Sequence, residues 1–154
     1  MPSILKAAQD LLALHGPPAP GKPPRVAYRM GADMDGDPLA CDCSAFVARC
    51  CGQRKNAGGV WYNTDRIWSD ATGANKRWRK IDAPVPGCIG VYPGRTVVGK
   101  RHAGHVWVVV DPATAETIEC SSSGKGINRR SRPAWFKPGA KENGVTIVWA
   151  EFVG

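Results

Sequence analysis

The sequence lacks any long hydrophobic run, any internal repeat and a recognisable export signal. No stretch approaches the ~20 apolar residues that a membrane-spanning helix needs, so we expect no membrane span. Residues 1–15 are partly apolar, but they lack the basic start, long apolar core and small-residue cleavage site of a secretory signal. With 154 residues and a hydrophobic share of 43%, the chain is predicted to be a single domain over residues 1–154, made in the cytoplasm.

Acidic residues are scarce relative to basic ones. The 13 Asp and Glu stand against 21 Lys and Arg, and the formal net charge is +8. Such a balance indicates an anionic partner, and nucleic acid, acidic lipid and acidic cell-wall polymers all qualify. The basic residues are spread along the whole chain and form no DNA-reading motif, which favours adhesion to a polyanion over sequence readout. We therefore expect no nucleic-acid partner.

Six cysteines need an explanation in a chain without a visible export signal, and four of them lie within eleven residues. A buried small hydrophobe is one interpretation for each. A zinc site is another, but neither Cys41 with Cys43 nor the adjacent Cys50 and Cys51 has the two-residue gap common in structural sites, so we expect no metal or other cofactor. A disulfide that involves Cys41 or Cys51 is favoured if the protein works in an oxidising space.

Helix signals come first along the chain and strand signals second. Helices are predicted over residues 3–15 with Ser3 as cap, over 42–52 with Asp42 as cap, and over 64–71 with Gly73 ending it. Residues 25–40 are predicted to be a loop or irregular arm. Short apolar runs predict strands at 88–92, 106–110, 117–120 and 145–152. This order predicts an α+β domain in which N-terminal helices pack on a central antiparallel β-sheet.

Cys43 at a predicted helix start and His105 at a predicted strand start are the residues best suited to chemistry. A cysteine in the first turn meets the positive end of the helix dipole, which favours the reactive thiolate. The same turn offers backbone N–H groups that can hold an oxyanion, and a nearby imidazole can carry the proton. From the residues alone, a core cysteine and a strand-edge histidine are the alternatives.

Four segments in order resemble the signature of the NlpC/P60 cysteine peptidases, over about two thirds of the chain. They are Tyr28-Arg29-Met30-Gly31-Ala32, Asp42-Cys43-Ser44-Ala45-Phe46-Val47, the turn Pro86-Gly87 leading into Ile89-Gly90-Val91-Tyr92, and Gly104-His105-Val106-Trp107-Val108-Val109-Val110. The resemblance implies a papain-like fold with Cys43 as nucleophile and His105 as base. It assigns Glu119 as the third residue, which orients the imidazole; the family more often has histidine there, while the related CHAP amidases use a carboxylate.

The same resemblance places Tyr28, Asp42 and Ser44 at positions that line the site and hold the free amino end of a stem peptide. For Asp42 this role is compatible with the helix cap only if the cap leaves one carboxylate oxygen free. Trp107 replaces a small residue after the histidine, and we assign it to the substrate site, with packing in the sheet as the alternative. Trp61 and Tyr62, with Trp78, are candidates either for a stacking rim or for core packing.

The resemblance implies a hydrolase of bacterial peptidoglycan that cuts the bond between D-glutamate, through its γ-carboxyl, and a diamino acid. The alternatives are an N-acetylmuramoyl-L-alanine amidase of CHAP type, a cross-link-cutting endopeptidase and a non-catalytic basic protein that binds the cell wall or another polyanion. Without a signal peptide, the protein is expected to act on the cell wall or in the periplasm after delivery by a phage or a secretion system. We expect a monomer that meets an immunity or delivery protein.

Overall fold

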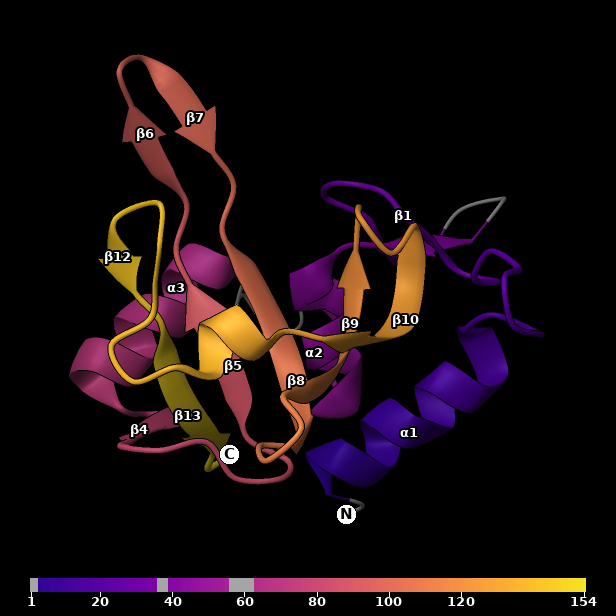
Figure 1. Ribbon diagram of the computed structural model, residues 1–154, viewed down its shortest axis with the longest axis horizontal. Coiled ribbons are helices and arrows are strands. Elements are labelled where there is room, and N and C mark those ends of the chain that lie inside the picture. Colours follow the sequence, from indigo (N-terminus) through magenta and orange to yellow (C-terminus); the bar gives the residue numbers. More distant parts are fainter. Residues whose placement is uncertain (1–2, 36–38, 56–62) are drawn as a thin grey trace.

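A six-stranded sheet forms the centre of the computed structural model, which describes residues 3–35, 39–55 and 63–154 (Figure 1). Its strand order is β10-β9-β8-β5-β13-β4, and every neighbouring pair is antiparallel. The predicted α+β class is confirmed. In chain order these strands are β4 (Trp78–Ile81), β5 (Ile89–Tyr92), β8 (His105–Asp111), β9 (Glu116–Ser121), β10 (Gly126–Ser131) and β13 (Val148–Phe152).

The helices begin where their capping residues stand. In α1 (Ile4–His15) the Ser3 hydroxyl accepts a hydrogen bond from the Lys6 N–H at 3.2 Å. In α2 (Cys43–Cys50) the Asp42 carboxylate caps the first turn. Both helices contact β8 and β9, and α3 (Thr64–Ser69) contacts β5. Along the part of the chain that the structure describes, no helix is long and apolar enough to cross a bilayer.

The two faces of the sheet carry two different apolar clusters, because side chains alternate along each strand. On β8, Val106 and Val108 belong to the cluster that contains α2, while Trp107 and Val109 belong to the other. The second cluster is closed by η3 (Pro133–Phe136), which lies on the opposite side of the sheet from α2 (Figure 1). His105 shares the parity of Trp107, so its side chain belongs to this second face.

Several elements differ from those that the sequence predicts. The third helix does not end at Gly73: α3 continues into the π-helical turn η2 (Asp70–Ala74), and Asn75 ends it with a left-handed φ of 52°. Residues 145–152 form β12 (Val145–Thr146) and β13, and β12 pairs with β11 (Lys141–Glu142). Residues 25–40, predicted as irregular, contribute to a small sheet of β1 (Ala27–Tyr28), β2 (Asp33–Asp35) and β3 (Ala40–Cys41).

Four strands are rich in basic residues and were not predicted from the sequence. β4 and β10 are sheet edges rich in Arg and Lys, and the hairpin of β6 (Arg95–Val97) and β7 (Lys100–His102) extends away from the body of the molecule (Figure 1). Edge strands commonly carry charged side chains, which protect their unpaired backbone groups from other chains. The apolar alternation that reveals a strand in the sequence is therefore missing from them.

Gly90 permits close packing at the centre of the sheet. A Cβ at this position would lie 2.4 Å from the Trp107 ring and 2.6 Å from the Trp149 ring. Overpacking of this kind costs about 1–3 kcal/mol. We predict that Gly90→Ala lowers the free energy of unfolding by that amount in urea denaturation, whereas Gly73→Ala, whose Cβ would meet open space, changes it little. Equal stabilities for the two variants would contradict this packing.

Candidate active site

Cys43 is the first residue of α2, and the Asp42 carboxylate shapes the turn around it. Asp42 Oδ1 accepts hydrogen bonds from the Ala45 N–H at 2.8 Å and from the Ser44 hydroxyl at 3.0 Å. The cap leaves other amides of the first turn without an intrahelical partner, as at every helix N-terminus. Cys43 therefore lies where partial positive charge is concentrated.

The second oxygen of Asp42 is also occupied. Oδ2 accepts from the Gly31 N–H at 3.0 Å and forms a short ion pair with Lys55, and both side chains of that pair are about 5% exposed. A carboxylate offers roughly four lone-pair positions, and four donors of this chain now approach them. A substrate amine would need one free carboxylate oxygen of Asp42, but both oxygens are bound by the protein itself.

His105 and Glu119 meet across two neighbouring strands. Val108 of β8 pairs with Ile118 of β9, so the antiparallel register places Glu119 diagonally from His105, within reach of a long side chain. The distance from His105 Nε2 to Glu119 Oε1 is 3.1 Å. Cys43 is the other side-chain partner of the His105 ring.

The Glu119 carboxylate is completely buried and has two further partners. The Thr117 hydroxyl donates to Oε2 at 2.7 Å. Arg132 approaches both oxygens: its Nε lies 3.4 Å from Oε2, and Nη2 makes a short contact with Oε1. The guanidinium of Arg132 also lies over the Trp135 ring, 4.5 Å from its centroid. These donors offset the cost of burying a charge.

The same contacts set the protonation states. Burial lowers the pKa of His105, but its hydrogen bonds with Cys43 and Glu119 outweigh burial and raise the pKa to about 9. For Glu119, burial raises the pKa, while the hydrogen bonds from His105 and Arg132 bring it down to about 2. At neutral pH the imidazole is therefore held as a cation beside a carboxylate anion.

A pocket of about 380 Å³ opens beside Cys43. Tyr28, Asp42 and Ser44 line it, as predicted for the substrate site. Burial, followed by the nearby Cys43 and Asp42, raises the pKa of Tyr28 to about 12, so its phenol is neutral. The second carboxylate among the lining residues that the structure describes, Asp65, pairs with Arg101 at 3.1 Å.

The structure corrects the role predicted for Trp107. Its ring has no exposed surface and does not line the pocket. It stacks instead on His105 at a centroid distance of 5.8 Å and on Trp135 at 4.3 Å. Trp107 therefore packs against the buried face of the His105 ring. This agrees with the alternative prediction that Trp107 packs in the sheet.

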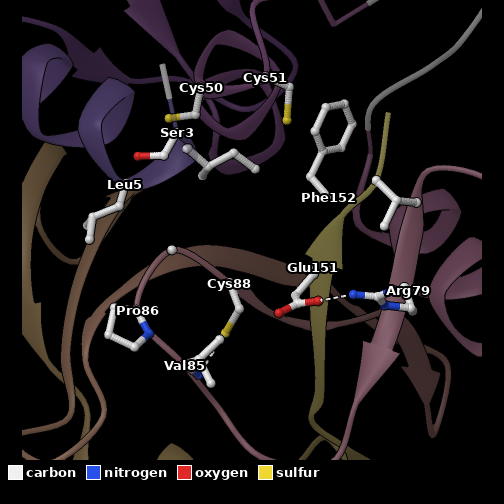
Figure 2. A pocket seen from close by; sticks show the side chains of 13 residues that line it. Ser3, Leu5, Cys50, Cys51, Arg79, Val85, Pro86, Cys88, Glu151 and Phe152 are labelled. Atoms are coloured by element: carbon white, nitrogen blue, oxygen red, sulfur yellow. Dashed lines mark hydrogen bonds and ion pairs between the residues drawn. The ribbon is translucent and has the colours of Figure 1, made fainter. Parts of the chain in front are cut away.

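Among the described residues, the other cysteines and aromatic residues that the sequence singled out do not line this pocket. Cys50, Cys51 and Cys88 line a separate pocket of about 460 Å³, beside the Arg79–Glu151 ion pair (Figure 2). Trp78 is 2% exposed and packs in the core, so it does not form a stacking rim. Trp61 and Tyr62 lie outside the described residues. Within the described ranges, no three His, Cys, Asp or Glu side chains gather in a way that suits a metal ion.

Three residues of the site were missed by the sequence analysis. Thr117 is two positions from Glu119 and shares its strand face, so the alternation of a strand could have indicated it. Lys55 and Arg132 carry no such signal, because they come from outside the motif segments and reach the site only through the tertiary fold. Each supplies the positive charge that balances a buried carboxylate.

In Cys43, His105 and Glu119, a thiol at a helix start is hydrogen-bonded to an imidazole, and the imidazole contacts a buried carboxylate. This is the arrangement of cysteine peptidases and amidases. A family model described as the CHAP domain matches residues 33–123, more than half of the chain, and the chain belongs to this family. The family shown is thus the amidase relative of NlpC/P60. The protein is a cysteine-dependent hydrolase that acts on peptidoglycan. No curated protein matches the chain.

Because Glu119 stabilises the imidazolium, its neutral isostere should lower the pKa of His105. We predict that His105 titrates near 9 in NMR spectra and that Glu119→Gln lowers this pKa by at least about 1, as expected on loss of an adjacent opposite charge. Glu116→Gln is the matched control, since Glu116 lies in the same strand but pairs with Arg129. A wild-type His105 that titrates below 7, or an unchanged pKa in Glu119→Gln, would contradict the ion pair.

Proposed function

We propose that Cys43 is the nucleophile, His105 the general base and acid, and Glu119 the group that orients the imidazole and stabilises its charge. The observation that carries this proposal is the continuous contact from Cys43 through His105 to the buried Glu119 carboxylate. A structural cysteine would need neither the imidazolium nor the carboxylate. The three residues come from α2, β8 and β9, which hold them in a rigid frame.

The reaction follows from the protonation states. With the pKa of His105 near 9, the imidazole is protonated at neutral pH and stabilises the Cys43 thiolate. The thiolate attacks the amide carbonyl, and first-turn amides of α2 stabilise the oxyanion. His105 donates its proton to the leaving amine as the C–N bond breaks, which leaves a thioester on Cys43. The neutral imidazole then takes a proton from water, whose attack on the thioester releases the acid and restores the thiolate–imidazolium pair.

Several bonds of peptidoglycan are candidates for cleavage, and the contacts in the pocket favour one of them. The γ-D-glutamyl–diamino acid bond was predicted together with recognition of a free amino end, which needs an available carboxylate. Asp42 and Asp65 both have cationic partners within the chain. A neutral amide in place of that amine fits such a pocket better, because an ammonium would have to displace Lys55 or Arg101. We therefore favour the amide between N-acetylmuramic acid and L-alanine.

The wider setting of the protein stays a prediction. The net charge of +8 suits retention on acidic cell-wall polymers, in which electrostatic attraction raises the local substrate concentration. Delivery by a phage or a secretion system, an immunity partner and a monomeric state are likewise predicted from the sequence alone.

Digestion of purified peptidoglycan tests the assignment of the nucleophile. Wild-type protein should release soluble fragments, and Cys43→Ala should release none above the level of a blank, since the covalent step is lost. Cys50→Ala is the matched control, because it removes a thiol from the other end of the same helix. Digestion by Cys43→Ala at the wild-type rate would overturn the proposal.

Mass spectrometry of the products tests the bond. An amidase releases stem peptides with a free L-alanine amine and leaves muramic acid without a peptide. Cleavage after D-glutamate leaves an L-alanyl-D-glutamate dipeptide on the sugar. We expect the first pattern, and we expect a stem peptide acylated by muramic acid to be cleaved while the same peptide with a free amine is not. Sugars that carry the dipeptide would contradict the amidase assignment without affecting that of the nucleophile.

A further inference from the structure

Two thiols that the proposed reaction does not use lie against each other beside the site. The sulfur atoms of Cys41 and Cys120 are 2.9 Å apart, and neither side chain has exposed surface. Relaxed non-bonded carbon atoms stay about 3.5–4.0 Å apart, and sulfur is larger than carbon. A disulfide bond measures about 2.05 Å. The pair is therefore closer than a packing contact and needs only a small side-chain rotation to bond.

The positions of the two residues make the pair more than a local contact. Cys41 is in β3 and lies two residues before Cys43, whereas Cys120 is in β9 and directly follows Glu119. They are 79 positions apart in the chain. A bond between them would join the segment that carries the nucleophile to the strand that carries the orienting carboxylate, and would enclose α2, α3 and the strands between them.

We propose that Cys41 and Cys120 are a disulfide site, closed when the protein folds in an oxidising environment. The step is a thiol–disulfide exchange: an oxidised disulfide such as glutathione disulfide accepts two electrons and two protons, two glutathione thiols leave, and the Cys41–Cys120 bond forms. Cys43 is not part of this pair, because its side-chain partner is His105.

Once the chain has folded with both thiols reduced, the exchange becomes slow. The hydrogen bond with Cys41, together with burial, holds the pKa of Cys120 well above its usual range, which suppresses the thiolate that exchange requires. Access of an oxidant to two fully buried sulfurs is also blocked. Closure therefore accompanies folding, and the resulting bond is protected from reductants in the same way.

The other three cysteines offer no comparable pair. Cys50 and Cys51 are neighbours on the chain and line the same pocket as Cys88 (Figure 2). The Cys88 sulfur accepts a hydrogen bond from the Val85 N–H at 3.5 Å. These residues serve as controls because they are buried thiols of the same chain that the proposal leaves reduced.

The test refolds the full-length protein with glutathione disulfide and with reduced glutathione, alkylates free thiols in denaturant, and maps the peptides without reduction. Cleavage before aspartate separates Cys41 from Cys43, so the linked peptides are unambiguous. We expect the oxidised sample to contain a Cys41–Cys120 cross-link that the reduced sample lacks, and the peptides of Cys50, Cys51 and Cys88 to remain free of any cross-link. It should also have a melting temperature higher by several degrees than the reduced sample, because cross-linking a long loop restricts the unfolded chain.

The Cys41→Ser/Cys120→Ser double variant should show a melting temperature that is independent of the glutathione state, and Cys50→Ser/Cys88→Ser should behave as wild type. Six free thiols after oxidative refolding, or a cross-link that contains Cys43, would overturn the proposal. The peptide map uses wild-type protein, so it decides the question even if a variant folds poorly. None of these readouts depends on peptidoglycan cleavage, so the proposed activity can fail separately.

Discussion

The burial of the Glu119 carboxylate is the constraint on which the site depends. An unpaired anion in that position would be strongly destabilising. The chain meets this cost with a hydroxyl from Thr117, a guanidinium from Arg132 and an imidazolium from His105. The protonated state that catalysis needs is thus also the state that stabilises the fold. The Arg132 guanidinium also lies over the Trp135 ring, which packs beside the imidazole.

A second buried carboxylate, that of Asp42, organises the helix turn that holds the proposed nucleophile, Cys43. It fixes the first turn of α2 through Ala45 and Ser44, and it ties that turn to Gly31 and Lys55. The side chain that defines the position of Cys43 is therefore engaged by the chain on both oxygens. This engagement supports our proposal that the site does not select a free substrate amine and that the glycan–peptide amide is the bond cleaved.

The α+β class and the capped helices could be predicted because each rests on a local pattern, whereas the meeting of Cys43, His105 and Glu119 was implied only by the resemblance to the NlpC/P60 peptidases. Ser3 and Asp42 precede apolar helical faces, and Glu119 lies in an apolar strand. The remaining features depend on distant contacts. The basic strands β4, β6, β7 and β10 show no apolar alternation, and Arg132 reaches Glu119 only because β10 pairs with β9. Trp107 was assigned to the wrong environment because strand parity does not reveal that Trp135 covers that face.

In the proposed mechanism, the contact between His105 and Glu119 keeps Cys43 in a reactive state. The most direct measurement is the rate at which each of the six cysteines is alkylated by iodoacetamide at pH 7 in the folded protein, followed by peptide mass spectrometry. We expect Cys43 to be modified faster than a free thiol such as glutathione and well before the other five cysteines, since the thiolate is the reactive form. Modification of Cys43 no faster than that of Cys50 or Cys88 would contradict it.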